Sequence, residues 1–326
     1  MELIGNSRAW EYIRKNISDC SAYLFTGPDG IGKRSMAIEA AALLMCTESY
    51  PCGKCRGCTR TKAMNHPDVM FLENAEGRAS IGIDDVRSGI AQVQSRPYEG
   101  RHRVWIIGEA ERLTDEAQSA LLKTLEEPPP YLLMILCAPS ENALLPTVVS
   151  RCRLIRFQPA DIAEIARWLE NCGISSEKAA AAAGISGGAP GLALRLAQDE
   201  ELWEMRCAVK EAAREIIRAD LWQALQVASR FEDMFVHKND PKLDYTRILD
   251  ILRSLWRDAL CCASGAESGL AANVDCQDAI EELASEGTEK IIRKMEFIEN
   301  ARENLSRSVQ PRLWLENLCL GLAGFL

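Results

Sequence analysis

The feature that most constrains this chain is a glycine-rich turn between an apolar run and an alanine-rich segment near its start. Residues 22–26 predict a buried β-strand, the turn GPDGIGKR follows, and residues 35–45 predict a helix. In such a P-loop, Gly27, Gly30 and Gly32 let backbone N–H groups converge on phosphate oxygens, and Lys33 adds a positive charge. A purely structural strand-to-helix turn remains the alternative interpretation.

The pattern after the turn predicts the fold class. Further apolar runs at 68–72, 104–107, 132–137 and 154–157 alternate with amphipathic helical segments. Alternating strands and helices predict an α/β domain, a parallel sheet with helices on both faces, over residues 1–158. From Pro159 the pattern is only helical, and we expect a small helical module over 159–199 and an all-α domain over 200–326.

Four cysteines form the strongest candidate metal site. Within an insertion at residues 46–58 they are separated by five, two and two residues, and glycine, lysine and arginine surround them: Cys46, Cys52, Cys55 and Cys58. Four thiolates at this spacing suit tetrahedral Zn²⁺, and no histidine lies inside the cluster to suggest an open catalytic site, so a closed structural site is predicted. Four free thiols are the alternative, but this polar segment offers them no apolar core. The other nine cysteines are predicted to be small core residues.

Two positions argue against a Mg²⁺-dependent nucleotidase. Such an enzyme needs a Ser or Thr hydroxyl after the P-loop lysine and an Asp at the end of the neighbouring strand. Arg34 and Gly108 stand in those places, although Glu109 keeps the acid that would polarise water. We therefore expect no Mg²⁺ and no turnover, while Lys33 leaves weak ATP binding open.

Arg151 is the candidate catalytic residue. It lies in the sequence Ser-Arg-Cys at 150–152, just before the last predicted strand. An arginine at a strand entrance is most often a solvated surface charge. At a subunit edge it can instead reach the γ-phosphate held by a neighbour and act as an arginine finger.

Charge and hydropathy exclude several classes of protein. The formal net charge of the 326 residues is −9, which argues against a protein that coats DNA. No run of eighteen apolar residues and no signal-peptide segment are found, so we expect a cytoplasmic protein without a membrane partner.

With these residues in view, the chain resembles the delta prime family of bacterial DNA polymerase III clamp-loader subunits, which are of AAA+ type. The resemblance extends over essentially the whole chain. Its specific parts are the four-cysteine insertion, the stretch LTDEAQSALLKTLEEPP at 113–129, and Ser-Arg-Cys at 150–152.

The resemblance implies a Rossmann-like AAA+ domain, a helical lid and a helical collar through which five subunits form an open ring. ATPase members carry an arginine in the lid motif, where this chain has Gly191 in Gly-Ala-Pro-Gly. The implied function is a non-hydrolysing stator that lends Arg151 in trans to a neighbouring ATPase and helps to load the sliding clamp. The implied partners are the gamma/tau ATPase subunits, the delta subunit, the sliding clamp and primer-template DNA within the complex.

Two other functions are weighed against this one. The first is a catalytically active AAA+ clamp-loader ATPase that holds magnesium with unusual ligands such as Ser35 or Glu109. The second is a zinc-dependent nucleic-acid-binding module, with a phosphate-binding patch around the cysteines formed by Lys54, Arg56, Arg60 and Lys62. A polymerase active site is not expected, because no carboxylate pair is placed for two-metal chemistry.

Overall fold

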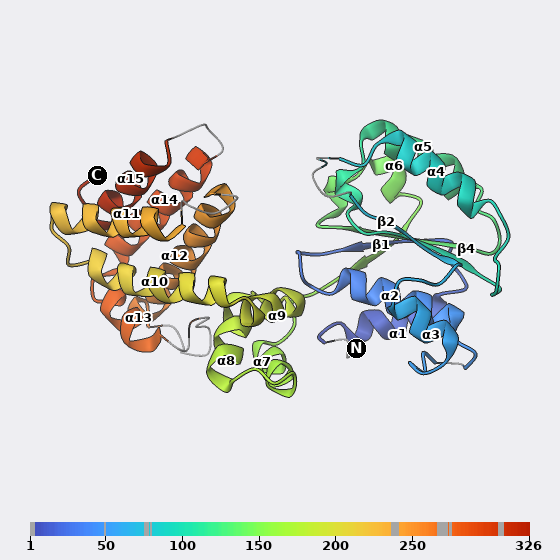
Figure 1. Cartoon of the computed structure of the whole chain (residues 1–326), viewed down its shortest axis with the longest axis horizontal. Helices are drawn as coiled ribbons and strands as arrows, with labels where there is room; N and C mark the ends of the chain where they lie inside the picture. The colour runs from blue at the N-terminus through green and yellow to red at the C-terminus, as the bar shows by residue number, and fades with distance from the viewer. Residues whose placement is uncertain are drawn as a thin grey trace. The chain divides into compact units, whose positions relative to one another are not determined.

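The computed structural model describes residues 4–48, 50–74, 78, 80–235, 241–265, 273, 276–305 and 310–326. The chain divides into two compact units (Figure 1). We call residues 1–164 with 188–192 the sheet unit, and residues 165–187 with 193–326 the helical unit. Each unit is described by itself.

A parallel sheet of five strands, in the order β2-β3-β4-β1-β5, forms the centre of the sheet unit. The strands are β1 (Ala22–Thr26), β2 (Val69–Leu72), β3 (Arg103–Ile107), β4 (Leu132–Ala138) and β5 (Arg153–Arg156). The helices of this unit are α1 (Ser7–Asn16), α2 (Lys33–Met45), α3 (Arg56–Lys62), α4 (Ile83–Val93), α5 (Asp115–Glu126) and α6 (Pro146–Val149), with 3₁₀ turns at Ala110–Arg112 and Glu141–Ala143.

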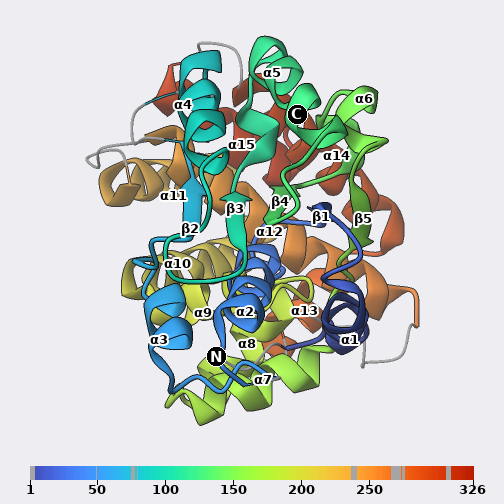
Figure 2. The same ribbon diagram turned by 90° about the vertical axis from the view of Figure 1, so that its right-hand side faces the viewer.

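Each face of the sheet has its own hydrophobic core, because side chains alternate between the faces along every strand. Tyr23 and Phe25 of β1 pack with buried residues of α1 and α2, whereas Leu24 faces the core under α4 and α5. Figure 2 shows α1 and α2 on one side of the strands and α4, α5 and α6 on the other. The α/β fold class predicted from the sequence is confirmed.

The helical unit contains only helices among the residues that the structure describes. They are α7 (Ile162–Asn171) and α9 (Pro190–Gln198), which both begin in the sheet unit, and α8 (Ser176–Ile185), α10 (Glu200–Ile216), α11 (Leu221–Phe235), α12 (Pro241–Ala263), α13 (Gln277–Ala284), α14 (Thr288–Leu305) and α15 (Pro311–Ala323). The helices from α10 through α15 share one hydrophobic core, in which Trp256 and Leu315 are fully buried. The division at residue 200 between a lid and a collar stays a prediction, since the helices on both sides of it fall in one unit.

Local sequence explains where several helices begin. The Thr114 hydroxyl accepts a hydrogen bond from the N–H of Ala117 at the start of α5, and Asp199 caps α10 in the same way through Leu202. No helix in the described ranges is both long and apolar enough to cross a membrane.

The structure also differs from the sequence prediction in two respects. The short helices α3 and α6 were not predicted, because glycines and cysteines in one and a proline in the other masked any helical periodicity. The prediction that the nine remaining cysteines are core residues is wrong for Cys172 and Cys262, which are exposed near the carboxyl ends of α7 and α12. Cys137, Cys276 and Cys319 are buried as predicted.

Candidate functional site

The P-loop turn joins the carboxyl end of β1 to the start of α2. Gly27, Gly30 and Gly32 have φ angles of 149°, 75° and 102°, a backbone region that suits glycine. The ammonium group of Lys33, which is 9% exposed, donates hydrogen bonds to the carbonyls of Gly27 at 2.5 Å and Pro28 at 3.0 Å. The lysine charge is therefore bound to the loop's own backbone.

A second segment of the sheet unit covers the same loop. The N–H of Gly191 donates to the carbonyl of Gly30 at 2.8 Å. A Cβ atom at Gly30 would lie 2.6 Å from the backbone nitrogen of Leu192, and one at Gly191 would lie 3.0 Å from the Gly30 oxygen. Gly191 thus packs backbone against backbone on the P-loop, where a larger side chain would displace the turn.

The position after the lysine is occupied by an ion pair. The guanidinium of Arg34 contacts the carboxylate of Glu73, just beyond β2, at 2.5 Å. Glu73 also lies beside Gly108, and Glu109 pairs with Arg112 at 3.3 Å. An arginine offers no oxygen to a metal, and the carboxylates of Glu73 and Glu109 are paired with arginines, so the position after the lysine supplies no Mg²⁺ ligand.

The four cysteines come together as the sequence predicted. Their sulfur atoms, those of Cys46, Cys52, Cys55 and Cys58, lie within 4.8 Å of one another. Thiolates around one Zn²⁺ at about 2.3 Å are about 3.8 Å apart, and the sulfurs of Cys46 and Cys55 are 3.8 Å apart. This cluster could hold a metal ion such as zinc.

Backbone N–H groups point at these sulfurs. The N–H of Cys58 and of Thr47 lower the pKa of the Cys55 thiol to about 6, and the N–H of Cys55 also reaches the sulfur of Cys52 at 3.3 Å. Burial raises the pKa of Cys58 to about 12. A thiolate is thus favoured at Cys55, while Cys58 needs a metal to lose its proton at neutral pH.

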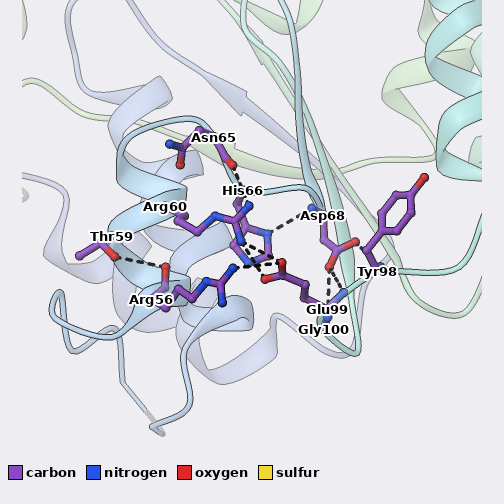
Figure 3. A network of polar contacts seen from close by, with 9 residues as sticks. All are labelled: Arg56, Thr59, Arg60, Asn65, His66, Asp68, Tyr98, Glu99 and Gly100. Atoms are coloured by element: carbon purple, nitrogen blue, oxygen red, sulfur yellow. Dashed lines mark hydrogen bonds and ion pairs between the residues drawn. The ribbon is translucent and has the colours of Figure 1, made fainter.

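Helix α3 begins at this cluster, with Cys55 as its N-cap and Cys58 in its first turn. Arg60 lies one turn along this helix, and its Nη1 atom donates to both carboxylate oxygens of Glu99 at 2.9 Å. Arg56 reaches the same carboxylate at 3.7 Å, as Figure 3 shows. The helix therefore connects the cysteine cluster to the loop at 95–102.

The loop at 95–102 is bound by Asp68, which precedes β2 and is fully buried. Its carboxylate accepts hydrogen bonds from the N–H groups of Tyr98, Glu99 and Gly100 at 2.6, 2.9 and 3.1 Å (Figure 3). Burial alone would raise the pKa of Asp68, but these three donors and Arg103 outweigh it and lower the pKa. Asp68 is consequently an ionised structural residue.

The predicted phosphate patch around the cysteines loses most of its charge to such pairs. Arg56 and Arg60 share Glu99, and Lys62 contacts Glu39 of α2 at 2.7 Å. The nucleic-acid-binding alternative therefore gains no support from the geometry.

Arg151 lies between α6 and β5. It is therefore at the amino ends of the parallel strands, whereas the P-loop is at their carboxyl ends. In the pairing of the parallel strands β1 and β5, Tyr23 is aligned with Arg153 and Thr26 with Arg156. Arg151 therefore precedes the amino end of β5, whereas the P-loop follows the carboxyl end of β1. The candidate arginine cannot reach the P-loop of its own chain.

Sequence reasoning missed the acidic partners of these site residues: Glu39, Glu73, Glu99 and Glu126. One signal was available for Glu39, because it is the single acid in the apolar helix α2. The others lie far along the chain from their partners, and only the fold brings them together.

Comparisons with known proteins show the family of the chain. A family model described as DNA polymerase III, delta subunit matches residues 7–161, and one described as DNA polymerase III, delta subunit, C terminal matches residues 212–323. The chain is similar to DNA polymerase III subunit delta' of Escherichia coli strain K12, with 31% identity over 268 residues, 81% of this chain and 76% of the relative.

Two further relatives show the range of the similarity. Subunit delta' of Yersinia pestis is 33% identical over 276 residues, 81% of this chain and 76% of its own. DNA polymerase III subunit gamma/tau of Mycobacterium bovis is 29% identical over 329 residues, 92% of this chain and 56% of its own. With both family models and delta' relatives matched over most of its length, this chain belongs to the delta' subunit family of DNA polymerase III.

Proposed function

We propose that this chain is a non-hydrolysing delta' subunit of a clamp loader, a stator that supplies Arg151 in trans to the ATP site of a neighbouring subunit. Its partners are then the gamma/tau and delta subunits, and the assembly loads a sliding clamp onto primer-template DNA. The names of its relatives, which include gamma/tau subunits, support that setting. The protein has no ATPase activity of its own in this proposal.

The observation that carries the proposal is the state of the P-loop lysine. Lys33 donates to the carbonyls of its own turn, and the N–H of Gly191 closes on Gly30 from the other side. A nucleotide would have to displace both contacts. Its Mg²⁺ ion would then lack the usual hydroxyl ligand, because Arg34, paired with Glu73, follows the lysine. These features favour a P-loop with a structural role over one that binds and hydrolyses a nucleotide.

The position of Arg151 supports the second half of the proposal. It stands at the sheet edge away from the P-loop, and its side chain is 34% exposed. The guanidinium of Arg151 can therefore meet another subunit, but it cannot reach the P-loop of its own chain. An arginine that approaches a γ-phosphate from a neighbouring chain raises turnover by roughly three to five orders of magnitude in other phosphoryl-transfer systems.

Zinc completes the proposal as a structural ion. Cys46, Cys52, Cys55 and Cys58 would hold it, and it would fix the first turn of α3 without entering any reaction step. The three-domain division at residues 158 and 199, with the last domain as the oligomerising collar, is part of the same proposal.

The test uses the chain alone and the reconstituted complex with gamma/tau, delta, clamp and primed DNA. Alone, the chain should contain one zinc ion and show no Mg-ATP turnover; turnover that vanishes in Lys33→Ala would establish an active ATPase instead. In the complex, Arg151→Ala should assemble normally and lose most DNA-stimulated ATPase activity. Arg156→Ala is the control, because it removes an exposed arginine from the other end of β5. Unchanged turnover with Arg151→Ala would refute the trans role.

A further inference from the structure

Arg151 does not project freely from the edge of the sheet, because two neighbours hold its guanidinium. Nη2 contacts the Oε1 atom of Glu126 at 2.5 Å, and Nη1 donates to the carbonyl of Thr147 at 2.9 Å. Glu126 is the last residue of α5 and Thr147 belongs to α6, so the two anchors come from different helices. Together they fix the direction of a long and otherwise mobile side chain.

The place of Glu126 is electrostatically unfavourable without this partner. It lies at the carboxyl end of α5, where the exposed carbonyls carry partial negative charge and a carboxylate is disfavoured. Glu127 follows at once, so two acids stand side by side at this helix end. The positive charge of the Arg151 guanidinium offsets the unfavourable negative charge of Glu126 at this helix end. Exposed ion pairs add little to stability, so stability alone does not account for this pair.

The two anchors leave part of the guanidinium available. A guanidinium carries five N–H groups in one plane, and Nη1 reaches the Ser150 hydroxyl only at a long 3.4 Å. Nε donates to no group in the part of the chain that the structure describes. A phosphate oxygen could therefore be bound while Glu126 and Thr147 keep their contacts.

We propose that Glu126 is a positioning residue for Arg151: its carboxylate holds the guanidinium in the orientation in which the remaining N–H groups meet the neighbouring subunit's phosphate. This inference rests on the proposed trans role of Arg151. A finger contributes only when its donors are placed to within a fraction of an ångström, so a loosened Arg151 loses rate even though its charge remains.

The experiment measures DNA-stimulated ATP turnover of the reconstituted complex with Glu126→Gln. The amide keeps the shape and a neutral acceptor but weakens the charge-assisted hydrogen bond. We expect kcat to fall about three- to tenfold with little change in the KM for ATP, because the interaction matters in the transition state. Glu127→Gln is the matched control. It removes the same charge from the adjacent residue, which makes no side-chain ion pair among the described residues, and it should leave kcat unchanged.

A double variant separates positioning from a general structural effect. Glu126→Gln combined with Arg151→Ala should turn over no more slowly than Arg151→Ala alone, because Glu126 acts through the arginine. The positioning role is refuted if the effects of Glu126→Gln and Arg151→Ala on kcat add in the double variant. It is also refuted if Glu126→Gln behaves like Glu127→Gln. In both cases the trans role of Arg151 stands. If Arg151→Ala itself has normal turnover, the proposed function fails first.

Discussion

Replacement of Asp68 by asparagine should destabilise the sheet unit more than any exposed charge change in it. The carboxylate is fully buried and accepts three backbone N–H groups, which close the loop at 95–102. Asparagine retains one acceptor oxygen and turns an NH₂ group toward donors. At least one buried N–H therefore loses its acceptor, which costs about 1–3 kcal/mol.

Arg103 adds to this cost. It is 3% exposed and lies 3.7 Å from Asp68, but it also donates to the carbonyls of Gln92 and Ser95. Because those acceptors remain, the full penalty of about 3–5 kcal/mol for an orphaned buried charge is not reached. We expect a total of about 2–4 kcal/mol, which for a unit of this size lowers the midpoint of thermal unfolding by roughly 5–15 °C.

The assay combines thermal unfolding with hydrogen exchange of the amides of residues 98–100, which should lose protection in Asp68→Asn. Asp84→Asn serves as the control, because this side chain is 94% exposed at the start of α4. An unfolding midpoint for Asp68→Asn equal to that of Asp84→Asn, with protection unchanged at 98–100, would refute the reasoning.

The pH dependence gives an independent check with a definite sign. The folded-state pKa of Asp68 is lowered, so its stabilising contribution is complete above the ordinary carboxyl pKa of about 4 and is lost as the pH falls through the lowered value. The difference in stability between the wild type and Asp68→Asn should therefore be constant near pH 7 and shrink in strongly acidic solution. A difference that grows on acidification would contradict an ionised Asp68.

Three further predictions concern the P-loop and the cysteine cluster. Gly30→Ala should destabilise the protein more than Gly32→Ala: both positions have positive φ, but only Gly30 has a backbone atom within 3 Å of the new Cβ, and thermal unfolding compares them. Lys33→Ala should lower stability by about 1–2 kcal/mol through its lost buried hydrogen bonds, measured by urea denaturation. Removal of zinc by a chelator, or Cys58→Ser, should unfold the seven-residue α3, seen as lost amide protection at 56–62, since so short a helix is not stable alone.

The periodicity of the sequence predicted most of the sheet unit. Strands such as 132–137 are continuous apolar runs, which occur when both faces of a parallel strand are buried, and the structure places β4 at the centre of the sheet. The cysteine spacing predicted a compact cluster for a similar reason, because a loop of thirteen residues keeps its four thiols close whatever the rest of the chain does.

The partners of the site residues could not be predicted in this way. Arg34 and Glu73, or Arg60 and Glu99, are separated by 39 residues in each case, and no local pattern relates them. The exposed Cys172 illustrates the same limit, since an apolar neighbourhood in sequence is not a buried one in space.

The sequence by itself determined the strand–turn–helix of the P-loop, the metal-binding spacing and the arginine before β5, because these depend on residues that are neighbours along the chain. Only the tertiary structure decided that Gly191 closes on the P-loop, that Arg151 stands at the opposite edge of the sheet, and that Glu126 holds it. The physical reason is that strand order and helix packing, which bury apolar surface across the whole domain, set which distant charges meet.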